Sequence, residues 1–141
     1  MRTIAIAAAL AAVLVPAATA GAATTTVKLH QSRYGRILVD GQGRTLYLFT
    51  RDRGAKSRCY GACARAWPPL QTDSEPQAGG GADAAKLGTT VRRGGATQVT
   101  YAGHPLYHYV NDRRPGQILC QDVAEFGGTW LVVSPSGHAV R

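Results

Sequence analysis

The residues with the most specific chemistry in this chain are its three cysteines, two of which are closely spaced. Cys59 and Cys63 lie four positions apart, so on a helix they share one face and are near enough to form a disulfide or to bind one metal ion together. Cys120 makes the count odd, so without a metal an oxidising compartment leaves one free thiol or one intermolecular bond. Every pairing is open, but Cys59 with Cys63 is favoured because the shortest loop closes most readily.

The alternative to a disulfide is a soft-metal or thiol-redox site. Thiolates and imidazoles are the ligands that Cu(I) prefers, and the candidate ligands are Cys59, Cys63, Cys120, His104 and His108. A proline separates the two histidines, and His108 falls in an expected strand, so the two rings need not converge. The sequence also lacks the paired Cys-x-x-Cys spacing of a zinc site. The main expectation is therefore a structural disulfide with no cofactor, and copper is the alternative.

A second pattern, Leu-Tyr-x-aromatic-x-x-Asp, occurs twice in the chain. Its copies contain Tyr47, Phe49 and Asp52, and then Tyr107, Tyr109 and Asp112. Side chains alternate along a strand, so the two rings of each copy face the same way, opposite its leucines. A short carboxylate at a strand end accepts backbone amide hydrogens in an Asx-type turn. The pattern predicts paired core rings and a turn-closing acid; exposed rings would instead form a platform for sugars or flat ligands.

Strands must position these residues, because short β-branched and aromatic runs bounded by Gly, Pro, Asn or Asp prevail. The runs cover residues 36–40, 44–50, 89–93, 96–101, 105–110 and 129–134. Hairpin-length connections join the first pair at 41–43, the third and fourth runs at 94–95, and the fourth and fifth at 102–104. The stretch 60–67 predicts a turn or two of helix that Pro68 ends. We expect a mainly β protein of antiparallel hairpins or meander, with one or two short helical turns.

The chain divides into a leader and one domain. Residues 1–20 contain a basic residue, an apolar run too short for a membrane span and a small-residue cleavage site, as secretory signal peptides do. The mature chain, 21–141, is long enough for a single β-rich domain. It contains repeat one at about 27–70, a flexible surface linker at about 71–86 and repeat two at about 87–141. The repeats should pack with pseudo-twofold symmetry, because one hairpin cannot bury its apolar face alone.

The chain is strongly basic, with a formal net charge of +8. Its arginines, Arg92 and Arg93 among them, are scattered along the sequence and are not clustered on one helix with exposed aromatics. We therefore do not expect nucleic-acid binding, and we expect a basic surface that adheres to an anionic cell envelope or glycan. No cysteine follows the cleavage point to take a lipid, so the protein should be secreted or envelope-associated.

With both copies of the motif, the sequence resembles the bacterial family called the secreted repeat of unknown function, whose members are predicted lipoproteins or exported proteins with a Tyr-x-(Phe/Trp/Tyr)-x-x-Asp motif. The flanking stretches CYGACARAWPPL and FGGTWLVVSPSG are also similar to those of the family. The resemblance covers nearly the whole mature chain. It implies an exported repeat protein and no particular activity.

Conventional catalysis has little support in the sequence. There is no G-x-S-x-G, no H-E-x-x-H and no glycine-rich phosphate loop before a helix, and the acidic residues are dispersed. We therefore expect an exported non-enzymatic binding or envelope-associated module. The alternative is an extracytoplasmic copper-handling or thiol-redox protein.

Overall fold

The computed structural model of this protein describes residues 13–17 and 24–141. The expected signal peptide, 1–20, therefore lies outside the described residues except for 13–17, whose larger side chains are exposed. In the described part of the chain, no helix has the length and apolar character needed to cross a membrane.

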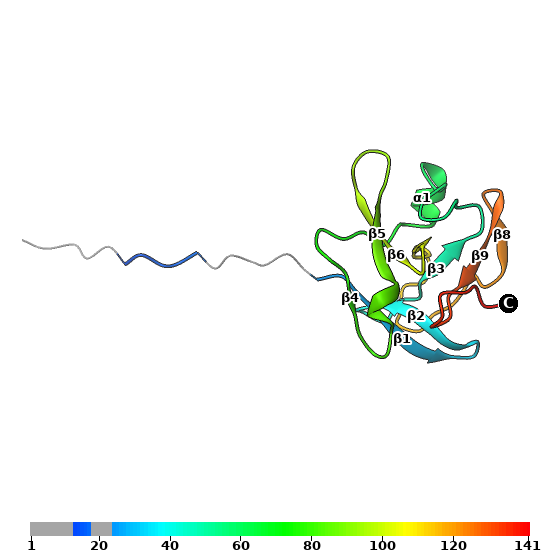
Figure 1. Ribbon diagram of the computed structural model, residues 1–141, viewed down its shortest axis with the longest axis horizontal. Helices are drawn as coiled ribbons and strands as arrows, with labels where there is room; N and C mark the ends of the chain where they lie inside the picture. Colours follow the sequence, from blue (N-terminus) through cyan, green and yellow to red (C-terminus); the bar gives the residue numbers. More distant parts are fainter. Residues whose placement is uncertain (1–12, 18–23) are drawn as a thin grey trace, which may run out of the picture.

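Three small sheets of three strands each make up the domain (Figure 1). The elements are β1 (Thr26–Ser32), β2 (Gly35–Asp40), β3 (Tyr47–Phe49), α1 (Ala62–Ala66), β4 (Gln77–Ala78), η1 (Ala84–Lys86), β5 (Leu87–Val91), β6 (Thr97–Tyr101), β7 (His104–Pro105), β8 (Val123–Glu125) and β9 (Gly128–Val132). The strand orders are β2-β1-β4, β3-β9-β8 and β5-β6-β7. The predicted fold class, mainly β with short helical turns, is confirmed.

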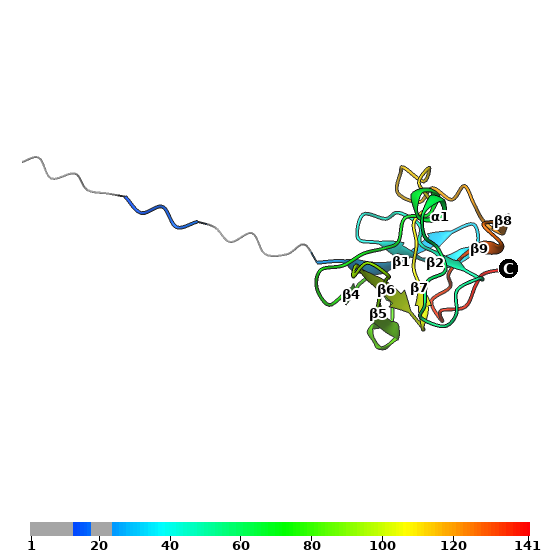
Figure 2. The ribbon, with the colours of Figure 1, turned by 90° about the horizontal axis from the view of Figure 1, so that it is seen from above.

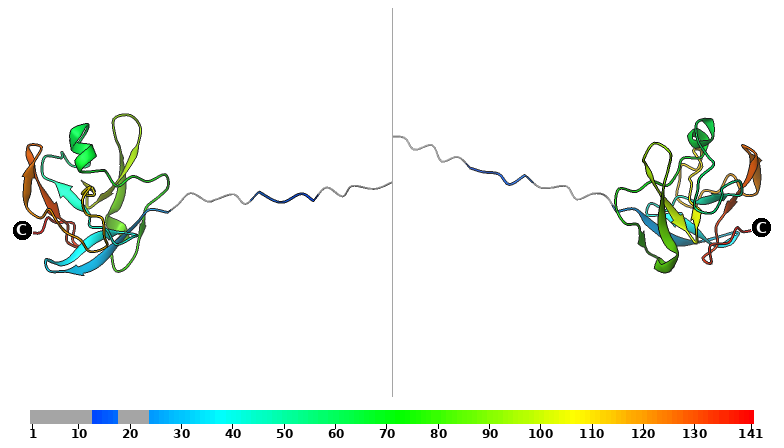
Figure 3. Two further views of the ribbon diagram at one scale, coloured as in Figure 1. Left: turned by 180° about the vertical axis from the view of Figure 1, so that it is seen from behind. Right: turned by 45° about the horizontal axis from the view of Figure 1, so that its top comes forward.

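The central strand is β3, which has the hairpin β5–β6 on one side and β8–β9 on the other (Figure 1). The β1–β2 hairpin lies below β3 in Figure 1 and at the bottom of the view from behind (Figure 3), and the view from above shows β1 and β2 side by side (Figure 2). Each face of β3 enters a different hydrophobic cluster: Tyr47 and Phe49 one, Leu46 and Leu48 the other. The predicted alternation of aromatic and aliphatic faces is therefore confirmed, and both faces are buried.

Two of the three expected hairpins form as paired strands, and the third forms only next to its turn. The antiparallel pairs β5–β6 and β6–β7 have the predicted connections. The hairpin expected between 36–40 and 44–50 forms at its turn, where Val39 bridges Thr45, Asp40 N–H donates to the Arg44 carbonyl at 2.9 Å and Leu46 N–H donates to the Leu38 carbonyl at 3.1 Å. It does not continue, because β3 leaves to pair with β9. Both faces of β3 are buried, so segments distant in the sequence must pack around it. One of them, β9, is its partner in the sheet.

Residues 105–110 do not form the expected continuous strand. After the short strand β7, Tyr107 makes isolated bridges to Tyr47 and to Pro69. This segment of repeat two therefore pairs through its backbone with two segments of repeat one.

The connection 71–86 is not the free surface linker that its composition suggests. Its strand β4 pairs in parallel with β1, with Thr26 opposite Gln77 and Val27 opposite Ala78. The Asp83 side chain accepts a hydrogen bond from Ala85 N–H and caps η1. This polar, glycine-rich segment is therefore partly ordered, because it lies beside the edge of β1 and pairs with it.

Candidate functional site

The two copies of the repeated motif contact each other at the centre of the domain. Tyr47 N–H donates to the Tyr107 carbonyl at 2.8 Å, and Tyr107 N–H donates to the Tyr47 carbonyl at 3.0 Å. The Tyr47 hydroxyl donates to the carboxylate of Asp112, and the Tyr107 hydroxyl donates to that of Asp52 at 2.8 Å. Each repeat therefore binds the aspartate of the other, as pseudo-twofold packing requires.

The aspartates also close loops, although not in the expected Asx-type turn. Asp52 Oδ1 accepts from Arg58 N–H at 2.7 Å, and Asp112 Oδ1 accepts from Leu119 N–H at 3.0 Å. An Asx turn would bind the amide two residues on, but these loops are longer. The second oxygen of each carboxylate points into the contact between the repeats, which turns the side chain away from its own adjacent backbone.

The ionisation of these groups fits a structural role. Burial raises the pKa of Asp52 to about 6, against the hydrogen bonds from Arg58 N–H and the Tyr107 hydroxyl. Burial also raises the pKa of Asp112, Tyr47 and Tyr107 above their ordinary values. The phenols therefore keep their protons at neutral pH and act as hydrogen-bond donors.

The aromatic rings continue the twofold relation. Trp67 and Trp130 stack in parallel at 4.0 Å between ring centroids, with Phe49 stacked on Trp130 at 4.0 Å and Tyr109 against Trp67 at 4.7 Å. Phe49 and Tyr109, which occupy equivalent motif positions, thus flank the two ends of the tryptophan pair. Apart from the partly buried Tyr109, these rings are buried, so the motif forms core and not an exposed stacking platform.

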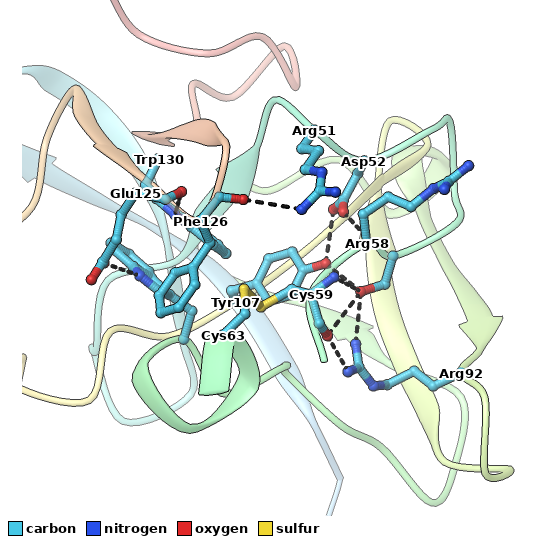
Figure 4. The surroundings of a disulfide bond; sticks show 12 residues. Arg51, Asp52, Arg58, Cys59, Cys63, Arg92, Tyr107, Glu125, Phe126 and Trp130 are labelled. Atoms are coloured by element: carbon cyan, nitrogen blue, oxygen red, sulfur yellow. Dashed lines mark hydrogen bonds between the residues drawn. A yellow bond between two sulfur atoms is a disulfide. The ribbon is translucent and has the colours of Figure 1, made fainter. Parts of the chain in front are cut away.

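The favoured disulfide is confirmed. Cys59 and Cys63 are bonded, with their Cα atoms 5.2 Å apart, at the start of α1 (Figure 4). Cys120 is a buried free thiol, and burial raises its pKa. A protonated, enclosed thiol is a poor nucleophile and a poor metal ligand.

The metal-ligand candidates of the sequence do not form a cluster. Cys59 and Cys63 are committed to the disulfide, and His108 Nε2 lies 2.8 Å from Asp40 Oδ2. Burial lowers the pKa of His104, and the charge of nearby His138 lowers it further. Within residues 13–17 and 24–141, no group of three or more His, Cys, Asp or Glu side chains has the geometry to hold a metal ion. Copper binding stays a prediction.

Sequence reasoning missed two buried polar contacts. Arg92, expected at the surface, is only 7% exposed. It donates to Ser57 Oγ at 2.9 Å and to the Cys59 carbonyl at 2.6 Å (Figure 4), and also to Gln98 Oε1 at 2.7 Å. The sequence signal for this burial is the strand alternation in TTVRR. Adjacent arginines on a strand face opposite ways, so when one is exposed to solvent the other points into the protein. Asp40 is also buried. Although its burial opposes ionisation, hydrogen bonds from His108 and Arg44 outweigh that effect and lower its pKa to about 2.

Above the disulfide lies a cationic surface that we call the basic face. It consists of the exposed side chains Arg51, Lys56, Arg58 and Arg93 around Tyr60. Two adjoining hollows, of about 550 and 270 Å³, share Arg58, Tyr60 and Arg93 in their walls. No acidic residue is among those that line either hollow. The face is therefore suited to anions.

Tyr60 organises this face. The guanidinium carbons of Arg92 and Arg93 lie 4.4 and 4.0 Å from the centre of its ring, and its hydroxyl accepts from Arg93 N–H at 3.2 Å. Burial opposes ionisation of the phenol, but the Arg93 hydrogen bonds and both arginine charges outweigh it and lower the pKa of Tyr60. Tyr60, one of the three residues between the two cysteines of the disulfide, thus binds the turn between β5 and β6 that carries Arg93.

The fold and the site define a class: a small exported-type β protein built from two copies of one unit that exchange tyrosine–aspartate hydrogen bonds. The chain belongs to the family described as a secreted repeat of unknown function, whose model matches residues 28–71 and again 88–134. The resemblance seen in the sequence is therefore confirmed. Comparison with curated proteins and with solved structures gives no significant match.

Proposed function

We propose that this protein is an exported, non-enzymatic binding module that holds anionic polymers of the cell envelope on its basic face. The observation that carries the proposal is the convergence of Arg51, Arg58 and Arg93 on one hollow without an acid in its lining. The description of the family as secreted supports the proposal, because an exported module would meet such polymers.

The chemistry of the face favours phosphate and carboxylate groups. A guanidinium group presents a planar fork of donors that matches either anion and stays charged at every physiological pH. Charges of one sign gathered within about 10 Å, roughly the Debye length at moderate salt, reinforce one another and attract polyanions from solution. Open hollows also suit a polymer that crosses the surface better than an enclosed small molecule.

The loop under the basic face is held in place before any ligand arrives. The Cys59–Cys63 disulfide closes the segment that contains Tyr60, and buried Arg92 binds the Cys59 carbonyl. A preorganised surface loses less conformational entropy on binding, which raises its affinity. The repeated motif has a separate task in this proposal, which is to hold the two repeats together beneath the face.

Binding of inorganic polyphosphate, polygalacturonate and neutral dextran to the mature protein tests the proposal. We expect both polyanions to bind, more weakly as salt rises, and dextran not to bind. The variant R51A/R58A/R93A should lose about tenfold in affinity, since each exposed ion pair contributes about 0.2–1 kcal/mol.

The matched control is R36A/R113A/R114A, which removes three exposed arginines outside the hollow and gives the same net charge. It should bind within about threefold of the wild-type protein, because only nonspecific attraction changes. Equal losses in the two variants would show that net charge alone drives binding and would contradict the proposal.

A further inference from the structure

The strand β5 presents an open edge. It lies at the end of the order β5-β6-β7, with β6 as its neighbour in the sheet. Two hydrogen bonds fix the alternation along the pair: Ala102 N–H donates to the Lys86 carbonyl and Arg92 N–H to the Ala96 carbonyl, both at 2.8 Å. In an antiparallel pair every second residue bonds to its neighbour. Gly88 therefore also faces β6 with its backbone groups.

The intervening residues of β5 direct their backbone groups away from β6. These are Leu87, Thr89 and Val91, which pair with Tyr101, Val99 and Thr97 in the register. Leu87 N–H binds the Ala84 carbonyl at the end of η1. Thr89 is exposed, and Val91 is 73% exposed. The open edge thus offers the N–H and C=O of both exposed residues to another strand.

This edge lacks the usual protection against strand addition. Natural edge strands carry a lysine, a proline, a bulge or an inward charge to prevent pairing. The five residues of β5, LGTTV, contain no charge and no proline, and they pair with β6 without a break in register. Exposed unprotected edges of this kind are sites of β-strand addition in proteins that recognise extended peptides.

A cleft of about 710 Å³ lies beside the edge, in the size range of ligand sites. Residues 72–78 form one wall, and the other consists of Ala84, residues 87–89 of β5 and residues 95–97 at the start of β6. The segment 72–78 and β5 lie on the same side of the molecule (Figures 1 and 3). The lining includes the exposed carboxylates of Asp73 and Glu75 and no lysine, arginine or histidine. In a chain with a net charge of +8, this is an acidic cleft on a basic protein.

We propose that the β5 edge and this cleft form a docking groove for an extended polypeptide segment with basic side chains. The segment would add as a strand to β5 through the backbone of Thr89 and Val91, and its lysine or arginine side chains would face Asp73 and Glu75. Backbone pairing supplies affinity in this mode, and side-chain contacts supply specificity. The cleft shares no lining residue with the two hollows of the basic face, and of the open edge only Val91, at its far end, also lines the smaller hollow.

Amide NMR with the blocked peptide acetyl-TKTKTKT-amide tests the groove. The peptide should slow hydrogen exchange at the Thr89 and Val91 amides and shift their signals. Two further peptides carry backbone N-methyl groups either on the lysines or on the threonines. Only one of these two sets of amides can face β5, so one methylated peptide should lose binding and the other should keep it. Equal binding by all three peptides, or changes confined to other parts of the protein, would overturn the proposal.

Variants give a second, independent reading. Thr89→Pro removes an outward N–H from an edge strand and should abolish peptide binding, whereas Thr89→Ser keeps the N–H and should bind as the wild-type protein does. Asp73→Asn with Glu75→Gln should weaken binding about tenfold, as expected for loss of two exposed ion pairs. A concentration-dependent dimer that Thr89→Pro abolishes and the peptide does not compete with would assign the edge to a second copy and overturn the peptide proposal.

Discussion

Removal of one hydroxyl group, in Tyr107→Phe, should destabilise the whole domain. The Tyr107 side chain is 0% exposed, and its hydroxyl lies 2.8 Å from Asp52 Oδ2 and 2.7 Å from Ser57 Oγ. Loss of a hydrogen bond to a charged acceptor costs about 1.5–3 kcal/mol. For a domain of this size that corresponds to a fall of about 5–15 °C in Tm. Tyr107→Ala should cost more, about 3–5 kcal/mol, because the buried ring is lost as well.

A double-mutant cycle isolates the contact between the repeats. Tyr107→Phe and Asp52→Asn, alone and together, are compared by urea unfolding followed through tryptophan fluorescence. We expect a coupling energy of about 1 kcal/mol or more, because the two side chains touch directly. The control is Tyr34→Phe, whose hydroxyl makes no hydrogen bond to a described residue and whose loss should change stability by less than about 0.5 kcal/mol.

The twofold relation makes the prediction stricter. The pair Tyr47→Phe and Asp112→Asn should show a coupling energy of the same sign and similar size, since it forms the equivalent contact. Coupling energies near zero in both cycles would refute the inference that these pairs hold the repeats together.

Three further predictions follow from buried groups. The folded carboxyl of Asp52 keeps its proton to about pH 6 and an unfolded aspartate to about pH 4, so its contribution to the free energy of unfolding should fall as pH rises through this window; Asp52→Asn should lack that slope. Thiol titration should find one reactive group, Cys120, in urea without reductant and almost none in the native protein, and stoichiometric Cu(I) binding would instead favour the copper alternative. Arg92→Met should lower the free energy of unfolding by about 2 kcal/mol or more and Arg93→Met by less than about 0.5 kcal/mol, as chemical denaturation would show.

Local patterns in the sequence predict much of this structure. Period-two alternation places Tyr47 and Phe49 in one cluster and their leucine neighbours in the other. Loop length correctly favours the Cys59–Cys63 disulfide, and glycine-containing turns mark two real hairpins. In each case the decisive interaction lies between residues close in sequence, so composition and spacing are sufficient.

The features that the sequence could not predict depend on distant partners. The pairing of β3 with β9, and not with β2, follows from a strand buried on both faces, which local turn chemistry does not reveal. The sequence predicts that Asp52 and Asp112 close local turns, but each also accepts a hydrogen bond from a tyrosine of the other repeat. The burial of Arg92 is not evident from the sequence, because its neutral partners lie in two segments distant along the chain, Ser57 and Cys59 in one and Gln98 in the other.

One comparison tests most directly the division of labour between the motif and the surface. Polyphosphate is titrated against the wild-type protein, R51A/R58A/R93A and Tyr107→Phe at a temperature at which all three are folded. Our account predicts that the arginine variant loses about tenfold in affinity with unchanged stability, and that Tyr107→Phe loses stability but binds as the wild-type protein does. Weaker binding by Tyr107→Phe, together with full binding by the arginine variant, would contradict the account and place the site at the repeated motif.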